Sequence, residues 1–261
     1  MRKNRFAAFG GGAIIGTLGG LIGLGGAEFR LPLLIGMFGF VSLEAVILNK
    51  AMSIVVVASA LPFRAGTIPF SVLMDHWGVI LNLLAGSLLG AWVGAGWAIQ
   101  LRTETLYRVI AVLLLFIALL LMFGHNPANP GIPPLAGATQ VTAGVAAGFG
   151  IGIVASLLGV AGGELLIPTL VLLFGIDIKL AGSLSLAISL PTMLVGFSRY
   201  SADQSFAVLG QNRGFLLVMA VGSLFGAFLG GQLVGMVPAG LLLPLLAVIL
   251  VISAIKVWRH G

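Results

Sequence analysis

Long apolar segments, separated by short polar turns and glycine breaks, occupy most of the chain. A helix needs about 20 apolar residues to cross a bilayer, and most of these segments approach or exceed that length. They predict an all-α, polytopic integral membrane protein. The expected helices cover 6–23, 28–39, 43–62, 77–100 and 105–123 in the first half, and 140–159, 164–175, 180–198, 214–236 and 240–257 in the second.

The two halves of the chain repeat one another at a spacing of 136 residues. The segment GLGGAEFRLP, which begins at Gly23, matches GVAGGELLIP, which begins at Gly159, without a gap. The same spacing pairs GSLLGA at 86–91 with GSLFGA at 222–227, and a constant spacing over such a distance is hard to obtain by chance. We therefore expect a first transmembrane repeat over 1–123, a proline-containing linker over 124–139 and a second transmembrane repeat over 140–261.

Basic residues gather in four polar regions, which include both ends of the chain and the segment 199–213. Because positively charged loops stay in the cytoplasm, this bias predicts a multi-pass protein of the bacterial inner (plasma) membrane with cytoplasmic amino and carboxyl termini. Under the repeat, the basic segments 1–5 and 102–108 correspond to the neutral segments 124–139 and 237–240. Equivalent loops then face opposite sides, which predicts two inverted-topology repeats of about five helical segments each. A parallel arrangement is the alternative.

Composition narrows the chemistry that such a protein can perform. The chain is 59% hydrophobic and 8% charged, a composition far from that of soluble domains, so we expect the protein to be embedded in lipid. It has no cysteine and three histidines, which fall in predicted loops or at the tail, so we expect no metal site and no cofactor. The basic residues are scattered among helix ends, as for topology signals, so we expect no nucleic-acid partner.

The two segments that follow the glycine breaks, with about 12 residues each, are too short to cross the membrane. At 1.5 Å per residue they span roughly 18 Å of a hydrocarbon layer about 30 Å thick, so each is expected to begin near the midplane. The glycines at these breaks then expose N–H groups at the positive end of a helix, which suits an anion. The residues concerned are Gly25, Gly26, Gly162 and Gly163. The alternative is that these glycines only permit close helix packing.

Four charged residues fall inside these apolar helices. Glu28 and Glu164 occupy matched positions at the start of the two short helices, and Arg30 and Lys50 balance their charge to zero when all four are ionised. Each carboxylate can cap free N–H groups in a purely structural role. The functional alternative is that Glu28 and Glu164 take up a proton, which leaves a net positive site for an anion and couples transport to protons.

Lys50 has two possible environments. It lies about seven residues into its helix, where it can reach the membrane surface as an anchor paired with Glu44. Pointing inward, it would meet the substrate beside Asn49. The matched segment of the second half offers the hydroxyl groups of Ser183 and Ser185 instead, so the two half-sites are chemically unequal.

The duplicated motifs resemble those of the TauE/SafE family of sulfite and organosulfonate exporters. The resemblance rests on GLGGAEFRLP, on AGGELLIP and on Asn49-Lys50-Ala51, and it covers nearly the whole chain. It implies export of small sulfur-containing anions, and a site built by the two glycine turns with Lys50. Glu28 and Glu164 depart from the family pattern, which often has a further glycine or an apolar residue there, so we expect a different substrate or a different mode of coupling.

Together these features predict a secondary transporter, and most simply an exporter, of a small sulfur-containing anion that works by alternating access. A passive anion channel, or a transporter of another small organic anion such as a carboxylate, remains the alternative. A membrane enzyme would need Glu28 and Glu164 as its acid–base pair and is disfavoured, since no histidine-based cluster supports them. The expected partners are the small anion and the lipid bilayer, with the protein either a monomer or a homodimer.

Overall fold

The chain forms a bundle of helices, and the described residues contain no strand. The computed structural model describes residues 5–22, 26–65, 69–123, 135–232, 248, 250–252 and 254–259. Five helices in these ranges are long and apolar enough to cross a membrane. The prediction of an all-α polytopic membrane protein is therefore confirmed.

The helix bounds follow the apolar segments of the sequence closely. The final predicted helix is described only at residues between 248 and 259, nearly all of which are helical. The elements in order are α1 (Arg5–Ile22), α2 (Ala27–Gly36), α3 (Ser42–Ala65), α4 (Phe70–Asp75), α5 (Trp77–Gln100), α6 (Thr103–Phe123), α7 (Gly137–Leu158), α8 (Gly163–Phe174), α9 (Ile178–Tyr200), a 3-10 turn η1 (Gln204–Phe206), α10 (Ala207–Gln211) and α11 (Arg213–Gln232).

Three differences from the predicted bounds have local causes. Helix α2 ends at Gly36, short of the predicted 39, because the chain turns back through Gly39, whose φ of 69° is left-handed. The segments between the long helices contain α4, η1 and α10, which were predicted to be loops and are too short to show a helical period in the sequence. Helix α7 begins at Gly137, within the predicted linker.

The 136-residue spacing seen in the sequence also relates the starts of several helices. Helix α2 starts at Ala27 and α8 at Gly163, and α3 starts at Ser42 and α9 at Ile178. Each pair of start positions differs by 136, as do the starts of α5 and α11. The two halves therefore place their helices at corresponding points along the chain.

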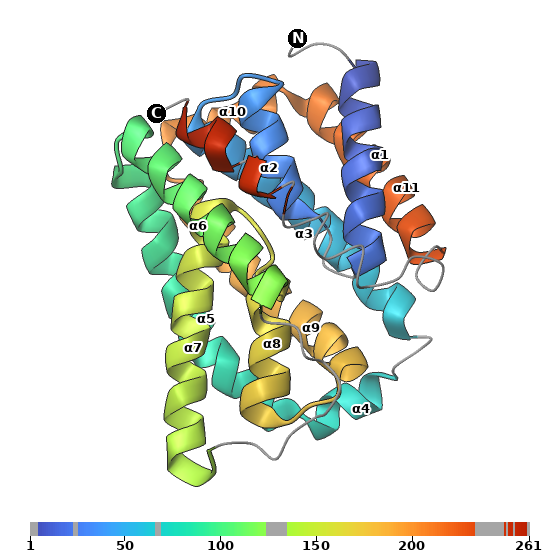
Figure 1. The fold of residues 1–261 in the computed structure, drawn as a ribbon, viewed down its shortest axis with the longest axis vertical. Coiled ribbons are helices and arrows are strands. Elements are labelled where there is room, and N and C mark those ends of the chain that lie inside the picture. The colour runs from blue at the N-terminus through green and yellow to red at the C-terminus, as the bar shows by residue number, and fades with distance from the viewer. Residues whose placement is uncertain are drawn as a thin grey trace.

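The halves interlock through their long helices. Helix α1 packs most extensively against α11, and α5 against α7, so the first helix of each half lies against a helix of the other half (Figure 1). Within these pairs, glycines on both helices approach the backbone of the partner, an arrangement that suits helix packing in lipid. Helices α3 and α9 also contact each other.

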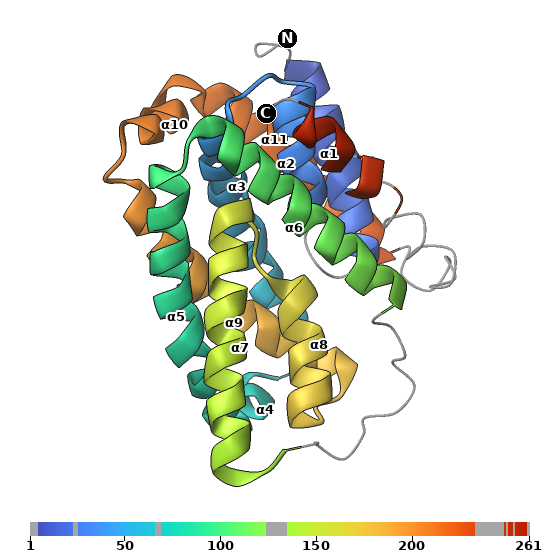
Figure 2. The same ribbon diagram turned by 60° about the vertical axis from the view of Figure 1, so that its left-hand side comes forward.

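The first helices of the two halves, α1 and α7, run in opposite directions through the bundle. Helix α1 begins at the end of the molecule that also carries α10 and the C-terminal helical residues, whereas α7 begins at the opposite end, which carries α4 (Figure 1, Figure 2). Helix α8 reaches from the interior toward the end that carries α4, and α2 toward the other end. Their starts thus lie inside the bundle, where side chains of α2 and α8 are buried.

Candidate functional site

Two glycines in a left-handed conformation start the short helices. Gly26 precedes α2 with a φ of 69°, and Gly162 precedes α8 with a φ of 83°. A residue with a Cβ is strained at such angles, so glycine suits both positions. No side chain caps either helix start, and Gly163 is the first residue of α8. The predicted site residue Gly25 lies outside the described residues.

The carboxyl groups of Glu28 and Glu164 come together between these two helix starts. Their side chains lie within hydrogen-bonding reach of each other, although they come from opposite halves of the chain. Glu28 is 1% exposed and Glu164 is 6% exposed. Among the described residues, no donor from another residue reaches Glu28 Oε1 or either carboxyl oxygen of Glu164, and each glutamate has only its own backbone N–H nearby. Two carboxyl groups can share a hydrogen bond only when one of them carries a proton, because an ionised carboxylate has no donor.

Arg30 lies two residues after Glu28 in α2 and is fully buried. Its Nη1 donates to Asn49 Oδ1 at 3.4 Å and to Ser53 Oγ at 3.3 Å. The guanidinium also attracts the carboxyl group of Glu28 electrostatically. The start of α2 therefore carries one positive and one negative group, and the positive group is hydrogen-bonded to α3.

Lys50 points toward the end of α7. Its Nζ donates to the carbonyl oxygen of Ala155 and to Ser156 Oγ, both at 3.2 Å, and its side chain is fully buried. Gly196 of α9 lies against this ammonium group and leaves the space that it occupies. Burial of Lys50 argues against the alternative in which it reaches the membrane surface as an anchor.

The polar groups of the second half are arranged differently. Ser185, at the position that matches Asn49, donates to Gly182 of its own helix at 2.9 Å. Ser183 is also buried in α9. Whether these two hydroxyl groups bind a substrate stays a prediction, and so does substrate binding by Asn49 and Lys50.

Sequence reasoning missed three polar residues that the structure places in this region. Ser53 accepts from Arg30, Ser156 accepts from Lys50, and the hydroxyl of Tyr200 donates to the Ser156 carbonyl oxygen at 2.7 Å. Ser53 could have been found from the sequence, because it lies one helical turn after Asn49 and is matched by Ser189 under the repeat. Tyr200 gives no such signal, because its importance depends on packing at the far end of α9.

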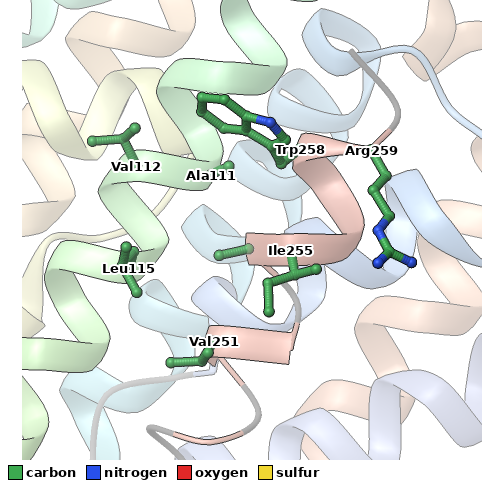
Figure 3. A pocket seen from close by; sticks show the side chains of 8 residues that line it. Ala111, Val112, Leu115, Val251, Ile255, Trp258 and Arg259 are labelled. Atoms are coloured by element: carbon green, nitrogen blue, oxygen red, sulfur yellow. The ribbon is translucent and has the colours of Figure 1, made fainter.

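A separate apolar groove of about 250 Å³ lies between α6 and the C-terminal helical residues (Figure 3). The guanidinium carbon of Arg108 lies 5.9 Å from the centre of the Trp258 ring beside it. None of the predicted site residues lines the groove. Its lining residues are Ala111, Val112, Leu115, Val251, Ala254, Ile255, Trp258 and Arg259.

Comparison with known proteins identifies the family to which this sequence is related. The sequence profile of the family described as "Sulfite exporter TauE/SafE" matches residues 8–257, which is nearly the whole chain. The chain belongs to the TauE/SafE family. The resemblance seen in the glycine motifs is thereby confirmed.

A curated relative supports membership of the TauE/SafE family. The "Probable membrane transporter protein YunE" of Bacillus subtilis (strain 168) is 26% identical over 243 residues, with 85% of each chain covered. No solved structure matches the chain at a significant level. The family and this relative are membrane transporters, so the predictions of a transmembrane transporter and of a protein that is not an enzyme are confirmed.

Proposed function

We propose that this TauE/SafE protein is a secondary transporter that exports small sulfur-containing anions, such as sulfite or organosulfonates, by alternating access. The observation that carries the proposal is the meeting of Glu28 and Glu164 at two helix starts inside the bundle. The positive ends of α2 and α8 favour an anion, and Gly26, Gly162 and Gly163 leave their N–H groups without side-chain caps. We place the substrate at these ends, beside Arg30.

The charges near the helix starts support coupling to a proton. Glu28 and Glu164 contribute two negative charges when ionised, and Arg30 and Lys50 contribute two positive charges, so the interior is then neutral. One proton shared by the two carboxyl groups leaves a single positive charge, which matches a univalent anion. The proton then crosses in the same direction as the anion, so net export requires a high internal concentration of that anion.

Alternating access follows from the relation between the halves. We interpret them as inverted-topology repeats, supported by the shared spacing of the helix starts and by the opposite directions of α1 and α7. In such transporters one half moves against the other around a central site. The end that carries the start of α1 and α10 is the cytoplasmic end in this proposal, since the basic regions of the sequence lie there.

Anion binding and transport test the proposal on the purified full-length protein. Sulfite and organosulfonates are expected to raise the temperature of thermal unfolding, because a ligand that binds only the folded state stabilises it by mass action. Sulfate and carboxylates, tested in parallel, report on charge and shape selectivity. In proteoliposomes, saturable counterflow of labelled sulfite supports a carrier, whereas single-channel currents would favour a channel. Absence of stabilisation by every anion, together with absence of counterflow, contradicts the proposal.

A further inference from the structure

The end of α7 is held by side chains from other helices. A helix leaves its last carbonyl groups without partners inside the helix, and these groups carry the negative end of its dipole. Here α7 ends at Leu158, and Gly159 caps it in a left-handed conformation with a φ of 66°. The backbone N–H groups of Gly159 and Val160 satisfy the carbonyl oxygens of Ser156 and Ala155 at 3.0 and 2.9 Å. Side chains from other helices supply further donors.

Two of these donors come from a single face of α3. Lys50 Nζ donates to the Ala155 carbonyl oxygen at 3.2 Å, and Asn49 Nδ2 donates to that of Leu158 at 3.1 Å. Ser53 Oγ lies 3.4 Å from the carbonyl oxygen of Gly159, but its proton is donated to the nearer carbonyl oxygen of Asn49 at 2.8 Å. Tyr200 of α9 supplies a third donor, to Ser156. Since a cation is stabilised at the negative end of a helix, the buried ammonium of Lys50 has a favourable position there.

Asn49 links this helix end to the start of α2. Its Nδ2 also donates to the carbonyl oxygen of Ala27, the first residue of α2, at 3.0 Å. Arg30 donates to its Oδ1, which fixes the orientation of the amide with both N–H groups toward the carbonyls. One buried amide therefore joins the glycine break of the second half to the short helix of the first.

The corresponding residues of the second half cannot make the same contacts. Ser185 donates within its own helix, and Leu186, which matches Lys50, has no polar side-chain atom. Ser189, which matches Ser53, has a buried hydroxyl group for which the described residues provide no partner. The side chains of α3 thus clamp the end of α7, whereas at the matched positions of α9 Ser185 bonds within its own helix and Leu186 has no donor.

We propose that Asn49 and Lys50 are positioning residues that clamp the end of α7, and that the transported anion is not bound by Lys50. The clamp fixes the break before Gly162, and so holds the start of α8 with Glu164 against Glu28. Its role in transport rests on the proposed function, whereas its role in holding the break is independent of it.

Cysteine labelling measures how firmly the glycine break before α8 is held, because a buried reporter cysteine reacts only when the break opens. The chain has no cysteine of its own to interfere. Ala161 lies in the break and is 5% exposed, and Ala118 is a fully buried control in α6. In the full-length protein, Lys50→Met is expected to raise the rate of N-ethylmaleimide labelling of an Ala161→Cys reporter by about tenfold or more, as expected for loss of hydrogen bonds to a charged group. Labelling of an Ala118→Cys reporter is expected to stay unchanged, whereas global unfolding would raise both rates.

Transport kinetics separate positioning from anion binding. Lys50→Met is expected to lower the maximal rate of sulfite counterflow while its KM changes by less than about threefold. A tenfold or larger increase in KM, with unchanged labelling of the Ala161→Cys reporter, would overturn the proposal and make Lys50 an anion ligand. Should Lys50→Met fail to fold, Tyr200→Phe removes one donor to α7 and keeps the ring, and unchanged labelling in that variant counts equally against the clamp. Absence of sulfite transport in the unmodified protein contradicts the proposed function and leaves the labelling result valid.

Discussion

Gly86 of α5 lies so close to the carbonyl oxygen of Val145 in α7 that a Cβ at Gly86 would overlap it. The equivalent contact in the other helix pair joins Gly222 of α11 to the carbonyl oxygen of Phe9 in α1. Both glycines begin the sequence blocks GSLLGA and GSLFGA, whose repetition the sequence reveals. The repeated blocks are therefore contact surfaces, and each one packs against the first helix of the opposite half.

This contact predicts that Gly86→Ala destabilises the protein. Overpacking at a tight backbone contact costs about 1–3 kcal/mol, so the free energy of unfolding is expected to fall by that amount. Thermal unfolding of the purified protein, followed through tryptophan fluorescence, provides the measurement. Gly150→Ala in α7 is the matched control, because a Cβ there meets nothing within 4 Å. Its unfolding temperature is expected to be unchanged or raised, and a similar fall in both variants would contradict the packing argument.

The sequence predicts that these helices make close contacts, but it does not predict which helices they contact. Glycines at 86 and 222 indicate that some helix approaches closely, and the repeat shows that both halves use the same device. The partner helix is not encoded locally, because any smooth apolar helix face could fill the same space. The exchange of partners between the halves thus becomes visible only in the structure.

In the candidate site, too, only some of the contacts could be predicted from the sequence. The matched positions of Glu28 and Glu164 suggest that two helix starts meet, and the structure brings these carboxyl groups together. The direction of Lys50 does not follow from its own neighbourhood. Its partner Ala155 lies 105 residues further along the chain, and the rotation of α3 about its axis decides whether the ammonium reaches lipid headgroups or α7.

A second difference between the halves concerns a buried hydroxyl pair. Ser87 Oγ in α5 lies 2.8 Å from Thr192 Oγ1 in α9, whereas Ser223, which matches Ser87, has a buried hydroxyl with no partner among the described residues. The residue that matches Thr192 is Val56, which has no hydroxyl group. We predict that Ser87→Ala lowers the free energy of unfolding by about 1 kcal/mol, as for hydrogen bonds between membrane helices. Ser223→Ala is expected to be neutral or stabilising, because it removes an unsatisfied polar group.

The same thermal unfolding assay decides this comparison. Thr192 keeps a hydrogen bond to the Ile188 carbonyl oxygen in the Ser87→Ala variant, which limits the expected loss. A larger loss of stability in Ser223→Ala than in Ser87→Ala would show that Ser223 has a bonding partner, and would refute the assignment.

The proposed orientation predicts which end of the bundle reacts from outside the cell. Leu135 precedes α7 at the end assigned to the exterior, and Ala202 follows α9 at the end assigned to the cytoplasm; both are exposed. In intact cells, a membrane-impermeant maleimide is expected to label Leu135→Cys and to leave Ala202→Cys unlabelled. After the cells are broken, both single-cysteine variants are expected to react. The reverse pattern in intact cells would place the amino terminus outside and contradict the orientation drawn from the basic residues.

Glu28 and Glu164 provide the test of proton coupling. Each of Glu28→Gln and Glu164→Gln keeps a polar side chain of the same shape but can no longer gain or lose a proton. In proteoliposomes, both variants are expected to retain sulfite counterflow, which needs no net proton movement. Uptake driven by an imposed pH gradient is expected to fall by about tenfold or more, because the neutral glutamine leaves the site positive without a proton and anion movement no longer depends on the shared proton. Glu104→Gln is the matched control, because Glu104 is exposed near Arg102 at the start of α6. This variant is expected to keep both activities unchanged. If both variants at the carboxyl pair accumulate sulfite in response to the pH gradient as well as the unmodified protein does, the pair caps the two short helices and the driving proton binds elsewhere.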